Sequence, residues 1–146
     1  MKKILLFVLI LFSSTTFAQL HKPVKWSYFA KKINQQEAEV YIKATVARGW
    51  HIYAMQDSEG PTKTSFSFTP SSSYRLIGKT LAPTPINKFD KVLQKKLSYF
   101  ENEVVFKQKI KLLKPKAVVS GVLEFMACSD KSCLPAEEVP FKIPIV

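Results

Sequence analysis

Strict alternation of apolar and polar residues is the feature of this sequence that most limits its fold. From position 38 to 46 the chain reads AEVYIKATV, which places Ala38, Val40 and Ile42 on one side and charged or polar residues on the other. A second run of the same kind lies at 104–112, where Phe106 and Ile110 alternate with lysines. A period of two is typical of a half-buried β-strand, because successive side chains point to opposite faces.

Further runs extend this pattern. Residues 118–128 predict a third long strand with a bulge at Gly121. Five shorter strands are expected at 25–30, 51–55, 65–69, 74–79 and 139–145. Pro140 and Pro144 cannot donate to a ladder, so the last of these strands should lie at a sheet edge. Residues 89–97 carry apolar residues near helical spacing and predict either a short helix or an irregular loop.

Turn residues such as Gly60-Pro61 and Lys114-Pro115 separate these runs. About eight short strands with almost no helix favour an all-β fold, an antiparallel β-sandwich. No repeat or linker divides the chain, so residues 19–146 are expected to form one domain.

The first residues predict a secretory signal peptide rather than part of the fold. A positive start at Lys2-Lys3 precedes an apolar stretch too short to cross a bilayer, and Thr16-Phe17-Ala18 offers small residues where a signal peptidase cleaves. Residues 1–18 are therefore interpreted as the signal peptide, and the mature chain is expected outside the cytoplasm, in the periplasm rather than secreted further.

The chain is basic, with 22 Lys and Arg against 11 Asp and Glu. Such a charge can favour nucleic acid, an anionic membrane surface or an acidic protein. Export argues against nucleic acid, and lysines spread along the chain also fit a solvated basic surface. No acidic pair, Ser/His/Asp set or glycine-rich phosphate loop stands out, so a hydrolase or nucleotide-binding enzyme has no support, and no cofactor is expected.

Cys128 and Cys133 are the only cysteines and flank four polar residues. Two cysteines in an oxidising compartment normally pair. The intervening Ser129-Asp130-Lys131-Ser132 resembles a hairpin loop, whose facing Cα atoms lie about 4.5–5.5 Å apart, within disulfide range. A loop this short gives only about 2 kcal/mol of stabilisation, and a bond at a loop tip tends to be exposed and exchangeable. Spacing alone leaves a structural staple and a redox centre equally open.

Residues near the pair offer chemistry as well as a simpler explanation. Lys131 could lower a thiol pKa and Asp130 could accept a proton, although both are also ordinary solvated turn residues. His21 and His51 have no ligand-like spacing to the cysteines, so no metal site is expected.

The block FMACSDKSCLP, residues 125–135, resembles the C-terminal signature of the N-terminal periplasmic domain of the thiol:disulfide interchange protein DsbD. The segment GWHIY at 49–53, with Gly60-Pro61 and Thr64, resembles an early strand motif of this family, and Tyr99-Phe100 with 105–108 resembles a third block. The blocks occur in order and span nearly the whole mature chain, and the cysteine block is the specific one.

The resemblance implies an immunoglobulin-like sandwich whose Cys128 and Cys133 exchange disulfides, with Cys128 attacking by its position in the motif and Tyr53 close by. It implies an oxidoreductase of the protein-disulfide reductase type. This domain would relay electrons from a thioredoxin-like periplasmic protein or domain to disulfide-bonded client proteins.

The sequence also departs from the family. The loop holds four residues instead of five, and in the stretch corresponding to the cap loop, about 88–93, only Phe89 is aromatic and could shield the cysteines. The chain ends at Val146 without transmembrane or thioredoxin-like parts, so a separate transmembrane electron carrier is expected. The alternative function is a non-catalytic immunoglobulin-like protein-binding module with a structural hairpin disulfide.

Overall fold

The computed structural model describes residues 22–55, 62–90 and 94–146, and this part of the chain is built from strands joined by turns and loops. Within these residues no helix is long and apolar enough to cross a membrane. The predicted signal peptide lies outside the described residues.

Eleven strands occupy the described residues. In chain order they are β1 Val24–Lys32, β2 Glu37–Val46, β3 Trp50–Tyr53, β4 Ser65–Phe68, β5 Tyr74–Leu81, β6 Ile86–Asp90, β7 Lys95–Phe100, β8 Glu103–Leu112, β9 Ala117–Phe125, β10 Ala127–Ser129 and β11 Glu137–Ile145. All pairings between them are antiparallel. The predicted antiparallel all-β architecture is confirmed.

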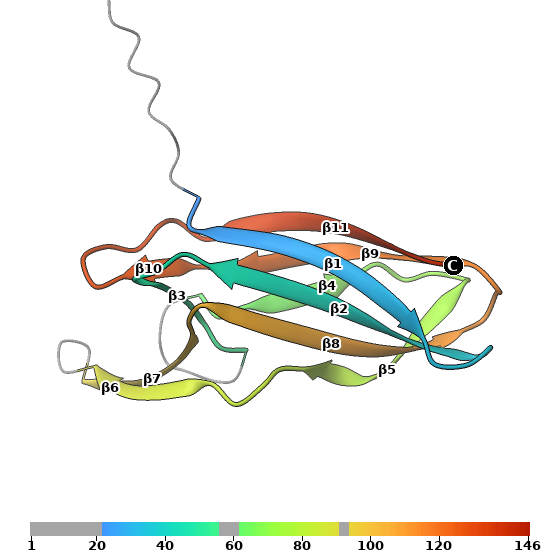
Figure 1. Ribbon diagram of the computed structural model, residues 1–146, viewed down its shortest axis with the longest axis horizontal. Coiled ribbons are helices and arrows are strands. Elements are labelled where there is room, and N and C mark those ends of the chain that lie inside the picture. The colour runs from blue at the N-terminus through green and yellow to red at the C-terminus, as the bar shows by residue number, and fades with distance from the viewer. Residues whose placement is uncertain (1–21, 56–61, 91–93) are drawn as a thin grey trace, which may run out of the picture.

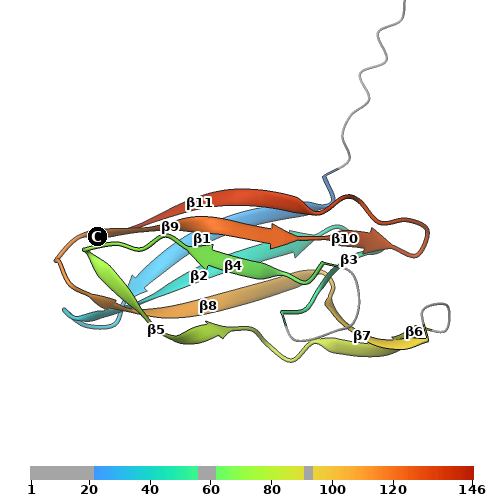
Figure 2. The same cartoon turned by 180° about the vertical axis from the view of Figure 1, so that it is seen from behind.

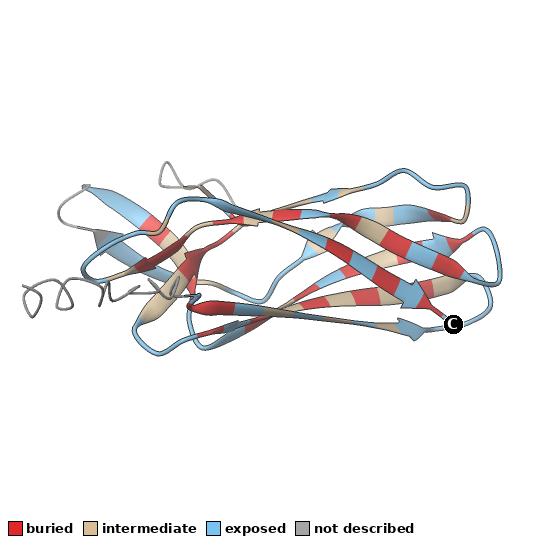
Figure 3. Ribbon diagram, turned by 90° about the horizontal axis from the view of Figure 1, so that it is seen from above, coloured by how far each residue is buried: buried red, intermediate tan, exposed pale blue. Residues whose placement is uncertain are grey.

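Two sheets form the body of the sandwich, one in the order β1-β2-β8-β5 and the other in the order β11-β9-β4 (Figure 1). The strands β2, β8 and β9 bury every second residue, and Figure 3 shows buried bands alternating with less buried ones along the chain. Aromatic rings join the two layers: Trp26 of β1 meets Phe125 of β9 at 5.2 Å between centroids, and Phe66 of β4 meets Phe106 of β8 at 4.9 Å. The alternation in the sequence therefore becomes a shared apolar core between the sheets.

A smaller sheet in the order β10-β3-β7-β6 lies at one end of the molecule (Figures 1 and 2). Its strands continue those of the body: β3 follows β2 through a turn at Gly49, which adopts a φ of 81°, and β10 follows β9 after Met126. Ile52 and Phe100 lie on one face of this sheet and pack into the main core. Packing against the core thus fixes the position of the small sheet. The opposite face of the sheet carries a separate set of side chains.

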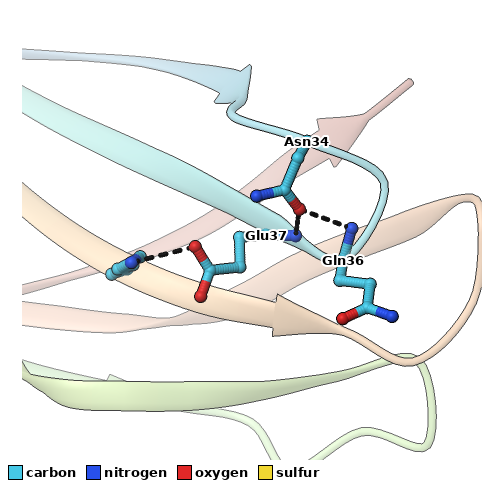
Figure 4. Close-up of polar contacts among 4 residues, drawn as sticks. Asn34, Gln36 and Glu37 are labelled. Atoms are coloured by element: carbon cyan, nitrogen blue, oxygen red, sulfur yellow. Dashed lines mark hydrogen bonds and ion pairs between the residues drawn. The ribbon is translucent and has the colours of Figure 1, made fainter.

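The tight β1–β2 turn lies at the opposite end of the molecule (Figure 1), and Figure 4 shows its polar contacts. Asn34 Oδ1 accepts hydrogen bonds from the main-chain N–H groups of Gln36 and Glu37, at 2.8 and 2.9 Å. The Glu37 carboxylate then pairs with Lys109 of β8 at 2.9 Å. This side-chain cap satisfies turn donors that no ladder reaches.

Several local expectations are confirmed and others are wrong. β11, with Pro140 and Pro144, is an edge strand as predicted. Residues 89–97 are neither a helix nor a loop throughout, because β6 and β7 pair there with Phe89 opposite Lys96. The residues between these strands, 91–93, are not described.

Gly121 does not form the predicted bulge. It pairs in register with Phe68 of β4 and Phe141 of β11, in the middle of the three-stranded sheet. A Cβ atom there would collide with the carbonyl oxygen of Ser67 and lie 2.7 Å from Phe141 Cζ. Glycine is required at this position because a neighbouring backbone and ring approach it closely.

Replacing Gly121 with alanine should therefore destabilise the fold by about 1–3 kcal/mol, since the clash is partly with backbone that cannot move cheaply. Chemical denaturation would measure the change. Val118→Ala on the same strand, at a position 51% exposed, is the control and should stay within about 0.5 kcal/mol. Equal stability of the Gly121→Ala protein and the wild type would show that the close packing at Gly121 is absent.

Candidate functional site

The cysteines lie at the end of the small sheet, where β10 ends and the chain turns back. Cys128 and Cys133 form a disulfide with their Cα atoms 4.0 Å apart, slightly closer than expected from the hairpin geometry. The two residues also form an antiparallel bridge. The predicted disulfide and its hairpin setting are both present.

The loop between the cysteines is fixed by its own hydrogen bonds. Ser129 N–H donates to the Ser132 carbonyl at 2.8 Å, and Leu134 N–H donates to the Ala127 carbonyl at 2.9 Å. Ser129 Oγ accepts from the N–H groups of Lys131 and Ser132, both at 3.2 Å. The second cysteine is consequently held beside the first by local structure as well as by the sulfur–sulfur bond.

The two cysteines differ sharply in burial. Cys128 is 1% exposed and packs in a cluster with Tyr53 and Leu97, whereas Cys133 is exposed. The expectation of an exposed loop-tip disulfide therefore holds for one sulfur-bearing residue and fails for the other. An attacking thiolate from another protein would meet Cys133 first.

The strand register explains which side chains surround the pair. Cys128 lies directly opposite His51 across β10 and β3, and Tyr53 lies opposite Tyr99 across β3 and β7. Facing residues of an antiparallel pair point to the same side, and residues two apart on a strand share that side. One face of the small sheet, turned away from Ile52 and the core, thus carries Cys128 with these three rings.

A hollow of about 420 Å³ opens on this face. It is lined by groups from all four strands of the small sheet and from the residues that follow them: His51, Tyr53, Lys88, Leu97, Tyr99, Glu101, Cys128, Ser129, Asp130 and Cys133. The hollow combines the disulfide with an imidazole, two phenols, two carboxylates and an amine, which are the groups that can move protons near sulfur.

The pKa of His51 is lowered from its ordinary value. Burial lowers the pKa of its imidazole, nearby Glu101 and Asp130 raise it, and Lys88 lowers it. Its Nε2 lies 3.4 Å from the Tyr53 hydroxyl, and its ring centroid lies 4.8 Å from that of Tyr99.

Tyr53, which the resemblance places near the pair, does pack with Cys128. Its carbonyl accepts a hydrogen bond from Thr64 Oγ1 at 2.7 Å, which ties the end of β3 to the segment leading into β4. The buried Thr64 therefore has a structural reason to be part of the early sequence motif.

Other predicted residues are distributed unevenly. Asp130 lines the hollow, whereas Lys131 is exposed and does not line it. Phe89 is 56% exposed on β6, next to Lys88, whose side chain does line the hollow. Because neighbours on a strand point to opposite faces, Phe89 faces away from the hollow in this structure.

Sequence reasoning missed the part of the site that β6 and β7 supply. Strand pairing brings four residues of this part near the cysteines: Lys88, Leu97, Tyr99 and Glu101. No local sequence pattern predicts these pairings. His51 was considered only as a metal ligand. Its position two residues before Tyr53 in an alternating strand was the available signal, because both side chains must share a face.

Within residues 22–55, 62–90 and 94–146 there is no group of three or more His, Cys, Asp and Glu residues placed to hold a metal ion. His21, the other histidine considered for metal binding, lies outside these ranges.

A family comparison agrees with this geometry. The model of the family described as "Thiol:disulfide interchange protein DsbD, N-terminal" matches residues 19–144. The chain belongs to the DsbD N-terminal family. This match confirms the resemblance seen in the sequence blocks. The chain also contains a disulfide-forming cysteine pair. A sequence search among curated proteins finds no significant match.

Solved structures support the same fold. The N-terminal periplasmic domain of ScsB from Proteus mirabilis aligns with a TM-score of 0.63 and 18% identity, over 84% of this chain and 46% of that one. This chain thus spans less than half of the ScsB chain. The reduced DsbD N-terminal domain of Neisseria meningitidis gives 0.52 and 16%, over 81% and 82%.

The complex of the DsbD and PilB N-terminal domains from Neisseria meningitidis gives a TM-score of 0.55 and 14% identity, over 85% of this chain and 87% of that one. At such identities the likeness establishes the fold, and the predicted immunoglobulin-like sandwich is confirmed.

The difference in burial predicts unequal reactivity after reduction. A single-cysteine protein that keeps Cys133 should react with iodoacetamide at least about tenfold faster than one that keeps Cys128, because the buried thiol is both shielded and harder to ionise. Mass spectrometry of Cys128→Ala and Cys133→Ala proteins over time would measure both rates. Faster labelling of Cys128 would contradict the difference in burial between the two cysteines.

Proposed function

We propose that this chain is a thiol–disulfide exchange domain that relays electrons through Cys128 and Cys133. The observation that carries the proposal is a disulfide with one buried and one exposed member, lining a hollow of proton-exchanging groups. A simple staple has no need of such surroundings, while exchange needs one reachable sulfur and a protected partner that resolves the intermediate.

Burial favours roles for the two cysteines that differ from those implied by their position in the sequence motif. An in-line attack needs access to the sulfur, and Cys133 is the exposed residue. Cys128, 1% exposed, is suited to attack or leave only within the domain. We therefore assign Cys133 as the residue that forms the mixed disulfide and Cys128 as the resolving cysteine.

The exchange balances in both directions. When the oxidised domain accepts electrons, a donor thiolate attacks Cys133 Sγ, the Cys128–Cys133 bond breaks, and Cys128 leaves as a thiolate. The donor's second thiolate then closes the donor disulfide and releases Cys133. In the opposite direction Cys133 attacks a client disulfide, and Cys128 attacks Cys133 Sγ to release the client's thiol.

The partners follow from the family. The electron donor we propose is a thioredoxin-like periplasmic protein or domain, and the acceptors are disulfide-bonded client proteins. Support comes from the related DsbD N-terminal domain solved in complex with a PilB N-terminal domain. The periplasmic location of the related ScsB domain, together with the predicted signal peptide at residues 1–18, supports periplasmic placement.

Asp130 and Lys131 are assigned lesser parts. Asp130 lines the hollow and contributes negative charge near the sulfurs, which opposes thiolate formation. The exposed Lys131 lies two residues before Cys133 and offers a solvated cation to an incoming thiolate. Phe89, on the outer side of β6, has no direct part in the exchange under this proposal.

Trapping tests the roles of the cysteines. A Cys128→Ala protein should accumulate a mixed disulfide between Cys133 and a disulfide-bonded client protein, because the thiol that would release the client is missing. The adduct would be seen on a non-reducing gel and should disappear on adding dithiothreitol. Cys133→Ala is the matched control and should give little adduct. The opposite pattern would return the attacking role to Cys128.

The reduction potential separates exchange from a staple. Equilibration in glutathione buffers should give the Cys128–Cys133 bond a potential between about −120 and −270 mV, the range of known exchangers. A value below about −300 mV is typical of structural disulfides. That result would favour the alternative, a non-catalytic protein-binding module with a hairpin staple.

A further inference from the structure

Exchange places a charge on a buried atom. Cys128 is 1% exposed and packs against Tyr53 and Leu97, yet it must carry a negative charge when it leaves or attacks. Burial in apolar surroundings raises a thiol pKa and makes the thiolate a poor leaving group. Some neighbouring group must therefore supply and remove a proton, or the buried cysteine would slow the reaction.

His51 is placed for this task. It is the direct partner of Cys128 across the β10–β3 pair, where facing Cβ atoms lie about 4.5–5.5 Å apart and point to one side. Both residues line the same hollow. The hydroxyl of Tyr53 lies 3.4 Å from His51 Nε2 and holds the ring beside the cluster that contains Cys128.

We propose that His51 is the proton-transfer partner of Cys128. This inference rests on the exchange function proposed above and deepens it. When a donor thiolate attacks Cys133 and the disulfide breaks, the His51 imidazolium gives its proton to the departing Cys128 thiolate. When Cys128 resolves a mixed disulfide, neutral His51 takes the proton from the Cys128 thiol, and the client's thiolate takes the electron pair of the broken bond.

Other groups in the hollow suit this role less well. The carboxylates of Glu101 and Asp130 carry a negative charge that opposes a thiolate. A tyrosine hydroxyl can donate a hydrogen bond but does not change charge between about pH 5 and 8, whereas an imidazole does. Lys88 lies on exposed β6, three strands from β10, which carries Cys128.

The charge state of His51 depends on burial and on charged groups around the hollow. The titratable side chains around it are Tyr53, Lys88, Tyr99, Glu101, Cys128, Asp130 and Cys133. Burial lowers the pKa of His51 most, Glu101 and Asp130 raise it, and Lys88 lowers it. A lowered pKa means that the imidazole is neutral at neutral pH, ready to accept the proton of Cys128, and becomes a donor as the pH falls.

Reduction by dithiothreitol tests the proposal without a protein partner. The second-order rate constant, divided by the fraction of dithiothreitol present as thiolate, should rise about tenfold as the pH falls from about 8 to about 5, because protonated His51 assists the departure of Cys128. In His51→Gln protein the normalised rate constant should be flat. A flat wild-type profile, or an unchanged profile in the variant, would overturn the proposal.

Two charge variants check the sign. Glu101→Gln removes a charge that raises the His51 pKa, so the midpoint of the profile should move to lower pH. Lys88→Gln removes a charge that lowers it, so the midpoint should move to higher pH. Both residues are exposed, and both substitutions leave Cys128 and His51 in place. Shifts in one common direction would assign the profile to a group other than His51.

Nuclear magnetic resonance gives a readout that does not depend on the folding of the His51→Gln protein. His21 is the only other histidine, so in His21→Gln protein the imidazole signal belongs to His51. In the reduced protein the signal of this imidazole should shift a second time at alkaline pH, when the adjacent Cys128 thiol ionises, and the oxidised protein and the Cys128→Ala protein should lack that step. A reduced protein whose His51 signal follows a single titration would contradict proton sharing.

The outcomes separate this inference from the exchange function. If Cys133 still traps a client protein while the His51→Gln profile equals that of the wild type, exchange stands and the role of His51 fails. If the His51 titration responds to reduction but the disulfide potential lies in the structural range, the coupling stands and the relay fails.

Discussion

The pairing of β10 with β3 is the constraint on which the candidate site depends. It places Cys128 opposite His51 while Ala127 and Ile52, the next pair along, face the main core. Side chains alternate between the two faces along each strand. The strands whose inner side chains anchor the small sheet in the core therefore carry, on the outer face, the side chains that line the hollow. The site is thus built largely on regular strands continuous with the core, while Glu101, Asp130 and Cys133 lie outside the strands.

The long strands could be predicted because their information is local. β2 and β8 bury every second residue, and their bounds follow the alternation within one or two positions. β6 and β7 were missed because their short sequences, INKFD and KKLSYF, show no clear alternation and are stabilised by pairing with each other and with β3. The role of Gly121 was predicted wrongly for a similar reason. The Phe141 ring that occupies the space beside it comes from β11, which is adjacent in the sheet but separate in sequence.

Only part of the candidate site could be predicted from the sequence, for the same reason. The cysteine pair, its hairpin and Tyr53 were accessible from spacing and from the family motif. The burial of Cys128 and the approach of Leu97 and Tyr99 were not, because they depend on the register of strands far apart in the chain. Register also decides which side of β6 faces the cysteines, and it brings Lys88 rather than Phe89 to the hollow.

A relay domain must keep its fold in both redox states, and the position of this disulfide permits that. The bond closes a loop with a sequence separation of 5, so the chain-entropy contribution is only about 2 kcal/mol. The main core lies between the two larger sheets and does not include either cysteine. The loop also keeps its Ser129–Ser132 and Ala127–Leu134 hydrogen bonds as a separate constraint. Reduction can therefore change the chemistry of the small sheet's outer face while the sandwich that positions His51 and Cys128 stays assembled.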